Sequence, residues 1–184
     1  MAPESRVATV RRAGPQDLGR LQAIQLAAGS TVPEVNLPAA GRALLVPAQS
    51  RAGDRQPRRA WVAADEHDDP VGFLLADVVD ECVHIEHVSV HPAYTGRGIG
   101  PMLLDHVDGW AARHNLRALT LIAFRGVPWN AAYYERLGFR ELETPDITPG
   151  LAARKDAKAT GAADPSALVC MHREVTPARA DANL

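Results

Sequence analysis

The stretch VSVHPAYTGRGIGPMLL, residues 88–104, decides the fold of this chain. An apolar run leads into a turn that carries Gly96, Gly98 and Gly100, and an amphipathic pattern begins directly behind the turn. Glycine lets the backbone approach a ligand closely, and a helix start offers unpaired N–H groups and the positive end of the helix dipole. The stretch therefore predicts a strand, a phosphate-binding turn and a helix in succession.

Two common nucleotide-binding motifs contain similar glycines, and this turn departs from both. A dinucleotide fingerprint has a third glycine where this chain has Pro101, and an acidic residue at the end of the next strand, which here runs into Arg125. A P-loop has Lys and then Ser or Thr behind its last glycine, where Pro101 and Met102 stand. An enzyme that uses a nicotinamide nucleotide therefore remains only as an alternative.

The rest of the chain predicts a mixed α/β sheet. Its elements do not alternate as regularly as those of a doubly wound fold, since two of the strands form a hairpin and two more form a final pair. An apolar stripe through Leu18, Leu21, Ile24 and Leu26 marks the first helix, and Asp17 stands where a capping residue belongs. The expected strands are 7–11, 59–64, 71–79, 83–90, 116–124, 139–142 and 168–174, and the other expected helices are 40–46, 98–111, 130–137 and 152–159.

Composition places the chain among ordinary one-domain proteins. It has 184 residues, 46% hydrophobic and 23% charged, which predicts a single domain over 5–176 and a disordered tail over 177–184. A net charge of −2 gives no indication of nucleic acid or an anionic membrane as partner. With no long apolar segment or signal peptide, we expect a cytoplasmic protein, and we expect Cys82 and Cys170 to be reduced thiols. No metal-binding pattern is present, so no metal is expected.

Two motifs together resemble the GCN5-related N-acetyltransferase (GNAT) family. Residues 95–100 overlay the family's phosphate motif, Gln/Arg-x-x-Gly-x-Gly/Ala, and Tyr134 followed by Gly138 and Phe139 resembles its C-terminal signature. The order of elements is also similar from about Val7 to Glu174. The resemblance implies a GNAT-type acyl-CoA N-acyltransferase fold, with a central twisted mixed sheet flanked by helices. It further implies that acetyl-CoA is the acyl donor and that a primary amine attacks it directly in a ternary complex.

The chain departs from the family pattern at three positions. Thr95 stands where the family usually has Gln or Arg, and Pro101 removes a backbone donor from the start of the helix. Many members carry an Asn seven residues before the tyrosine, where this chain has Val127. Asn130 lies only four residues before the tyrosine, and it either makes a similar contact from a shortened loop or caps its own helix.

The resemblance also implies which residues hold the cofactor. The backbone of residues 88–90 pairs with the pantetheine amides like an added strand, and the N–H of Val88 polarises the thioester carbonyl. The amides of the turn hold the pyrophosphate, and Arg97 adds positive charge. The expected cofactor-binding residues are Val88, Ser89, Val90, Thr95, Gly96, Arg97, Gly98, Ile99, Gly100, Pro101 and Asn130.

Two catalytic roles remain, an acid and a base. Tyr134 matches the family tyrosine whose hydroxyl reaches the CoA sulfur, and a phenol with a pKa of about 10 suits protonation of a thiolate. Strand alternation places His84, Glu86, Val88 and Val90 on one face, just upstream of the expected thioester. Glu86 is therefore the expected general base, with His84 as the alternative, and His87 faces the other way.

The motifs leave the acceptor open. We expect the irregular segments 29–57 and 144–167 to select a small-molecule or peptide amine. A module that binds acyl-CoA without transferring the acyl group is the alternative from another class. The apolar residues 168–171 either form a homodimer contact or belong to an internal strand.

Overall fold

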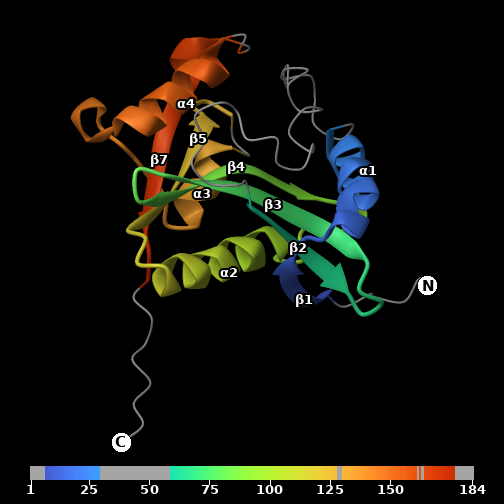
Figure 1. Ribbon diagram of the computed structural model, residues 1–184. Helices are drawn as coiled ribbons and strands as arrows, with labels where there is room; N and C mark the ends of the chain where they lie inside the picture. Colours follow the sequence, from blue (N-terminus) through green and yellow to red (C-terminus); the bar gives the residue numbers. More distant parts are fainter. Residues whose placement is uncertain (1–6, 30–58, 128–129, 161, 163, 177–184) are drawn as a thin grey trace, which may run out of the picture. The chain divides into compact units, whose positions relative to one another are not determined.

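The computed structural model describes residues 7–29, 59–127, 130–160, 162 and 164–176. Seven strands form one mixed sheet in the order β1-β2-β3-β4-β5-β7-β6, flanked by helices, as the sequence predicted. The predicted helix over 40–46 and the predicted disordered tail lie outside the described residues. The strands are β1 (Val7–Arg12), β2 (Arg59–Asp65), β3 (Pro70–Val79), β4 (Cys82–Val90), β5 (Ala118–Phe124), β6 (Arg140–Glu141) and β7 (Leu168–Glu174), and the helices are α1 (Leu18–Gly29), α2 (Ile99–Arg113), α3 (Ala131–Arg136) and α4 (Pro149–Ala159) (Figure 1).

The described residues group into two compact units, and each is described by itself. The first contains the chain up to Asp77 together with Glu86–Leu104. The second contains Val78–Ile85, Asp105–Thr160 and the chain from Asp164 onward. The glycine-rich turn belongs to the first unit and Tyr134 to the second.

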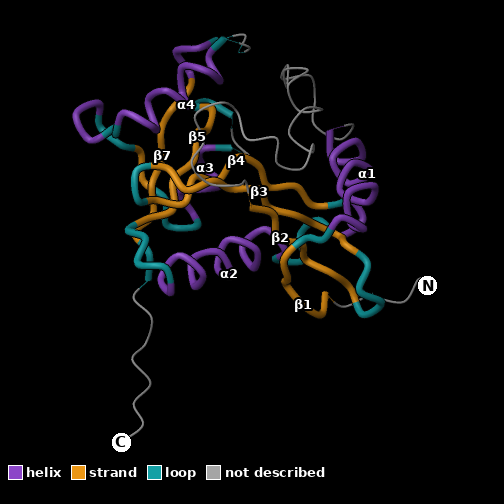
Figure 2. The backbone as a smooth tube through the Cα atoms, in the orientation of Figure 1, coloured by secondary structure: helices purple, strands orange, loops and turns teal. Residues whose placement is uncertain are grey.

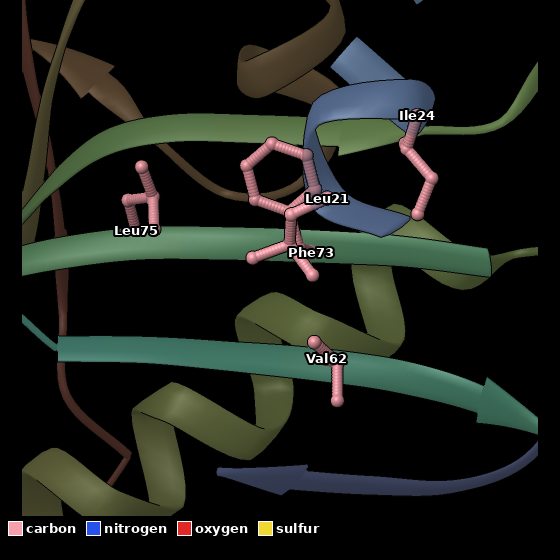
Figure 3. Close-up of a cluster of buried hydrophobic side chains, with 5 residues drawn as sticks. All are labelled: Leu21, Ile24, Val62, Phe73 and Leu75. Carbon is pink, nitrogen blue, oxygen red and sulfur yellow. The ribbon is translucent and has the colours of Figure 1, made fainter. Parts of the chain in front are cut away.

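The first unit is an antiparallel β1-β2-β3 arrangement with α1 packed on it. The predicted hairpin is confirmed, because β2 pairs with β3 and Trp61 lies opposite Leu74. Figure 3 shows where α1 lies, with Leu21 and Ile24 beside the side chains that β2 and β3 present. Five buried residues form the hydrophobic cluster between α1 and these strands: Leu21, Ile24, Val62, Phe73 and Leu75.

The prediction that Leu26 belongs to the apolar stripe of α1 is wrong. Leu26 is 64% exposed, whereas Leu21 and Ile24 are buried. Leu26 follows Ile24 by two residues, which is about 200° around an α-helix, so it cannot share the face that packs on the sheet. Leu26 therefore adds nothing to this core.

A buried carboxylate anchors the start of α1. Asp17 accepts hydrogen bonds from the Arg11 guanidinium at 2.8 and 3.1 Å, and its Oδ2 accepts one from the backbone N–H of Gly14 at 2.7 Å. These bonds, the guanidinium contact above all, lower the pKa of Asp17 below its ordinary value. Asp17 therefore caps the short 3₁₀ turn Pro15–Asp17, which precedes α1, and its bonds to Arg11 tie this turn to β1.

The second unit is built around β5 and β7. β4 pairs in parallel with β5 over Val83–Ile85, β5 pairs antiparallel with β7, and β6 pairs with the other side of β7. Figure 2 shows α4 beside β7, onto which it packs with Leu151 buried. Residues 168–171 are buried in this strand between β5 and β6, in agreement with the internal-strand alternative.

Other expectations hold with small shifts in boundary. β5 begins at Ala118 instead of residue 116, and α3 ends before Gly138, whose φ of 86° is the left-handed conformation typical of a helix C-terminus. Cys82 and Cys170 are both free thiols, as expected. Of the helices within the described residues, none combines the length and the apolar character needed to cross a membrane.

Candidate active site

The turn between β4 and α2 has the backbone conformation that its glycines allow. Gly96 and Gly98 have φ values of 78° and 76°, in the left-handed region that strains other residues. A Cβ at either position would meet no atom within 4 Å, so the turn needs these glycines for conformation and not for space. Thr95, Gly96, Arg97 and Gly98 are all exposed, and a ligand can reach the backbone of the turn from solvent.

The start of α2 offers donors toward this turn. The N–H of Met102 is bonded to the carbonyl of Gly98 at 3.1 Å, which makes it the first amide bonded within the helix. The N–H groups of Ile99 and Gly100 precede it and have no partner inside the helix. Pro101, which has no N–H, occupies the third position of this first turn, where proline is tolerated. The turn can therefore hold an anion with two helix-start amides and the positive end of the dipole.

An aromatic side chain holds Arg97 at the rim of the turn. The guanidinium carbon of Arg97 lies 5.0 Å from the centre of the Tyr94 ring, within range of a cation–π interaction. The His91 ring meets the Tyr94 ring edge-on, with 6.1 Å between their centres. The backbone N–H of Tyr94 also donates a hydrogen bond to the carbonyl of His91 at 2.8 Å, which holds the two residues close together. Arg97 is thus placed beside the turn that would receive a phosphate.

The second half of β4 presents its side chains as expected. His87 stacks on Phe73 at 5.4 Å, on the face of the sheet that α1 covers. Val90 lies on the other face, because a Cβ on Gly72 would meet both Val90 Cγ2 and Ile99 Cγ2 there. Strand alternation therefore places Glu86 and Val88 with Val90 and away from His87. Glu86 and Val88 are half-buried, and Ser89 is buried.

His84, the alternative base, lies inside the second unit. Its side chain is only 2% exposed, and its Nδ1 is 3.1 Å from the hydroxyl of Thr120, which is also buried. A histidine enclosed in this way cannot meet an acceptor amine that arrives from solvent. The geometry therefore favours Glu86 over His84 as the base.

Tyr134 stands in α3 among other aromatic rings. It makes edge-on contacts with Tyr133 at 5.2 Å and with Phe139 at 5.7 Å between ring centres. Burial raises the pKa of Tyr134 to about 12, and the neighbouring Tyr133 adds to this effect. The phenol therefore keeps its proton at neutral and moderately alkaline pH, and it is a weaker acid than the free tyrosine assumed from the sequence.

Asn130 does not cap its own helix, so that alternative is wrong. Its side chain makes no capping bond to α3, and Oδ1 accepts a hydrogen bond from the backbone N–H of Phe124 at 2.9 Å. The end of β5 is thereby joined to the start of α3.

Sequence reasoning missed Lys158. Its Nζ donates to the backbone carbonyl of Ile122 on β5 at 3.1 Å. Lys158 follows the buried Leu151 by seven residues, two helical turns along α4, so the helical spacing could have placed it on the face that packs on the sheet.

A small cavity in the second unit is a poor cofactor site. It has a volume of about 100 Å³ and is lined by side chains that include Cys82, Thr120 and His172. Sites for ligands of drug size are typically several hundred Å³. The exposed turn of the first unit is the better candidate for a molecule as large as a nucleotide-bearing thioester.

Comparison with known proteins agrees with this geometry and identifies the class. Residues 33–139, more than half of the chain, match the model of the acetyltransferase (GNAT) family. The chain belongs to this family.

Among curated proteins, the chain is similar to the peptidyl-lysine N-acetyltransferase YjaB of Salmonella typhimurium. The two are 31% identical over 80 residues, which cover 44% of this chain and 49% of the relative. The match thus spans about half the length of that relative.

Two solved structures show the same fold. The ribosomal-protein-S18-alanine N-acetyltransferase of Escherichia coli is 18% identical with a TM-score of 0.60, over 96% of this chain and 99% of that one. The PaiA N-acetyltransferase of Thermoplasma acidophilum, solved in complex with coenzyme A, is 15% identical with a TM-score of 0.60, over 90% and 98% of the two chains.

Proposed function

We propose that this protein is an N-acetyltransferase that moves an acetyl group from acetyl-CoA to a primary amine of a small molecule or peptide. The observation that carries the proposal is the turn at 95–98, which combines two left-handed glycines, an exposed backbone and the first amides of α2. Membership of the GNAT family and the coenzyme A complex of a structural neighbour support acetyl-CoA as the donor.

The donor would be held at two places along its length. The pyrophosphate would sit on the amides of Gly96–Gly100, with Arg97 adding a positive charge. The backbone of residues 88–90 would pair with the pantetheine amides, and the N–H of Val88 would polarise the thioester carbonyl. Pro101 leaves one amide fewer than the family often offers, so Arg97 carries more of the electrostatic attraction.

The reaction would be a direct attack without an enzyme-bound intermediate. The amine nitrogen attacks the thioester carbonyl carbon, a C–N bond forms, and the C–S bond breaks. Glu86 accepts the proton that the amine loses, directly or through water. Tyr134 donates a hydrogen bond to the departing sulfur. With a pKa of about 12 against about 8.5 for an ordinary thiol, Tyr134 stabilises the thiolate more readily than it protonates it fully.

The acceptor that we propose is a primary amine. The curated relative is a peptidyl-lysine N-acetyltransferase, and the E. coli structure is that of a ribosomal-protein-S18-alanine N-acetyltransferase. An amine on a peptide or a small molecule fits the same chemistry. The single-domain organisation over 5–176, the cytoplasmic location and a homodimer stay predictions from the sequence.

The first experiment is calorimetric titration with acetyl-CoA, repeated with CoA that lacks its 3′-phosphate. We expect clear binding of acetyl-CoA, followed by thiol release when a panel of amines is added. Binding without transfer to any amine would favour a sensor module. No binding at millimolar acetyl-CoA, together with a rise in melting temperature on adding NAD(H), would overturn the proposal in favour of a nucleotide-dependent enzyme.

A further inference from the structure

The helix that carries Tyr134 is too short to hold its own position. α3 spans six residues, Ala131–Arg136, whereas isolated helices shorter than about 12–15 residues are marginal in water. Its place in the protein therefore depends on contacts at its two ends. At the start, Asn130 Oδ1 accepts a hydrogen bond from the backbone N–H of Phe124 at 2.9 Å. At the other end, the contacts come from Arg173 of β7.

Arg173 contacts the turn behind α3 in three ways. Its Nη1 donates a hydrogen bond at 3.1 Å to the carbonyl of Leu137, one of the groups that the end of a helix leaves without a partner. Its guanidinium carbon lies 5.2 Å from the centre of the buried Phe139 ring. A Cβ on Gly138 would lie 3.4 Å from Arg173 Cδ, so the stem of the side chain also passes close to the turn. The turn is therefore held at a carbonyl, at a ring and along its backbone.

Arg173 is in turn held by carboxylates of α2. Its Nη2 lies 3.5 Å from an oxygen of Asp105 and 3.5 Å from an oxygen of Asp108. Asp108 also accepts a hydrogen bond from the backbone N–H of Thr176, just behind β7, at 3.2 Å. The side chains of Arg173 and Asp108 are only 18% and 9% exposed, so this pair is less screened by solvent than a surface pair. All these residues belong to the second unit.

The same turn determines where the Tyr134 side chain lies. The Tyr134 carbonyl accepts hydrogen bonds from the N–H groups of Leu137 at 2.9 Å and Phe139 at 3.1 Å. The Tyr134 ring packs edge-on against the Phe139 ring, with 5.7 Å between their centres. A displacement of Phe139 would therefore move both the backbone and the ring of Tyr134. A misplacement of about 1 Å can cost about 100-fold in the rate of an enzyme.

We propose that Arg173 is a positioning residue, which acts on catalysis by holding the turn Leu137–Phe139 and, through it, the ring of Tyr134. The inference rests on the proposed function, because it assumes that Tyr134 takes part in acetyl transfer. Arg173 affects the rate through Tyr134, so its effect should disappear when the phenol hydroxyl is absent.

A double-mutant cycle tests the inference. Thiol release from acetyl-CoA is measured, with the amine that the wild type acetylates fastest, for Arg173→Met, Tyr134→Phe and the double variant. We expect Arg173→Met to lower kcat by about 10-fold to 100-fold and to leave the KM for acetyl-CoA unchanged. In the Tyr134→Phe background the same substitution should cost less than about twofold, because the hydroxyl that Arg173 positions is no longer there.

Two further variants serve as controls. Arg173→Lys keeps a charged donor for the Leu137 carbonyl but loses the planar group over Phe139, and it should have an intermediate kcat. Arg140 is 72% exposed on the neighbouring β6, 3.8 Å from Glu174, and Arg140→Met should match the wild type. Melting curves check that each variant is folded. If Arg173→Met does not fold, Arg173→Lys is used for the same cycle.

Hydrogen exchange in the free protein tests the contact without a ligand. Arg173→Met should speed exchange at the amides of Gly138 and Phe139, whereas Arg140→Met should not. The inference is overturned by unchanged exchange, by an unchanged kcat, or by a loss of the same size in the Tyr134→Phe background. A wild type that acetylates no amine overturns the proposed function and the catalytic role of Arg173 with it, a result distinct from a failure seen only among the variants.

Discussion

Tyr134 shows how surroundings change the chemistry of a single hydroxyl. Among the rings of Tyr133 and Phe139, its ionised form is poorly solvated, and burial raises its pKa to about 12. A proton bound so firmly is present at every pH at which an amine acetyltransferase works. The role that suits this group is a hydrogen bond to developing negative charge on sulfur.

Replacing Tyr134 by Phe should lower turnover by roughly 10-fold to 1000-fold while CoA affinity stays unchanged. Because the phenol ionises only near pH 12, it should cause no loss of rate between pH 7 and 10, and the ratio of wild-type to variant rates should be constant over that range. Steady-state rates against pH check both points. If the wild type and the Phe variant have equal rates at all pH values, Tyr134 has only a packing role.

Tyr94 is a second residue whose ring has a testable effect at the site. It lies under the Arg97 guanidinium at 5.0 Å, and it is the natural candidate to keep that cation beside the turn. Tyr94→Leu should weaken CoA binding by about threefold to tenfold, the size of one cation–π contact, and Tyr94→Phe should retain the affinity. Calorimetry at low and high salt checks this, and a Leu variant with wild-type affinity would contradict it.

At the scale of elements, the turn works because two glycines bend the chain between β4 and α2. Their positive φ values let the backbone run from an extended strand to a helix start within a few residues. Below this junction, Gly72 of β3 allows α2 to approach closely, since a Cβ there would lie 2.9 Å from Ile99 Cγ2. The position of the helix start is thus set by a neighbouring strand as well as by the turn.

Gly98→Ala should disturb the turn without a steric clash, because the space beside it is open and only the left-handed φ is unfavourable. We expect CoA affinity to fall by at least about tenfold and stability by about 1 kcal/mol. Gly109→Ala is the control within α2. Its Cβ would make an ordinary contact with Arg113 at 3.4 Å, and the variant should gain about 0.5–1 kcal/mol with unchanged affinity. Urea denaturation and calorimetry compare the two, and equal affinities would contradict the assigned role of Gly98.

For the whole molecule, the Asp17–Arg11 pair links stability to pH. The carboxylate is 4% exposed, and the Arg11 bonds hold its pKa below the ordinary value of 3.8. Its stabilising contribution is therefore fully present above about pH 4 and is lost as pH falls through the lower folded value.

Asp17→Asn should cost about 1–3 kcal/mol at pH 7, and the difference from wild type should shrink below pH 4. Asp68→Asn is the control, since Asp68 bonds the same Arg11 but is 69% exposed, and it should cost less than about 1 kcal/mol. Urea denaturation at pH 7 and pH 3 measures both. A difference for Asp17→Asn that does not change with pH would show that its charge is not the cause.

The sequence by itself determined the order of elements, the glycine turn and the family. These follow from local properties, namely the apolar period of each segment, the conformational freedom of glycine and the spacing of Tyr134 from Gly138 and Phe139. That Glu86, Val88 and Val90 share one face of β4 could also be predicted, because the alternation of side chains along a strand is a local property.

Only the tertiary structure decided which groups meet across the chain. In the structure, Leu26 lies on the surface and His84 lies in the interior beside Thr120. Residues 168–171 belong to an internal strand. The tertiary structure also gave Asn130 and Lys158 their partners on β5 and raised the pKa of Tyr134. Each of these depends on residues distant in sequence, whose approach is set by packing and by the need to satisfy buried backbone groups, and no local pattern records such an approach.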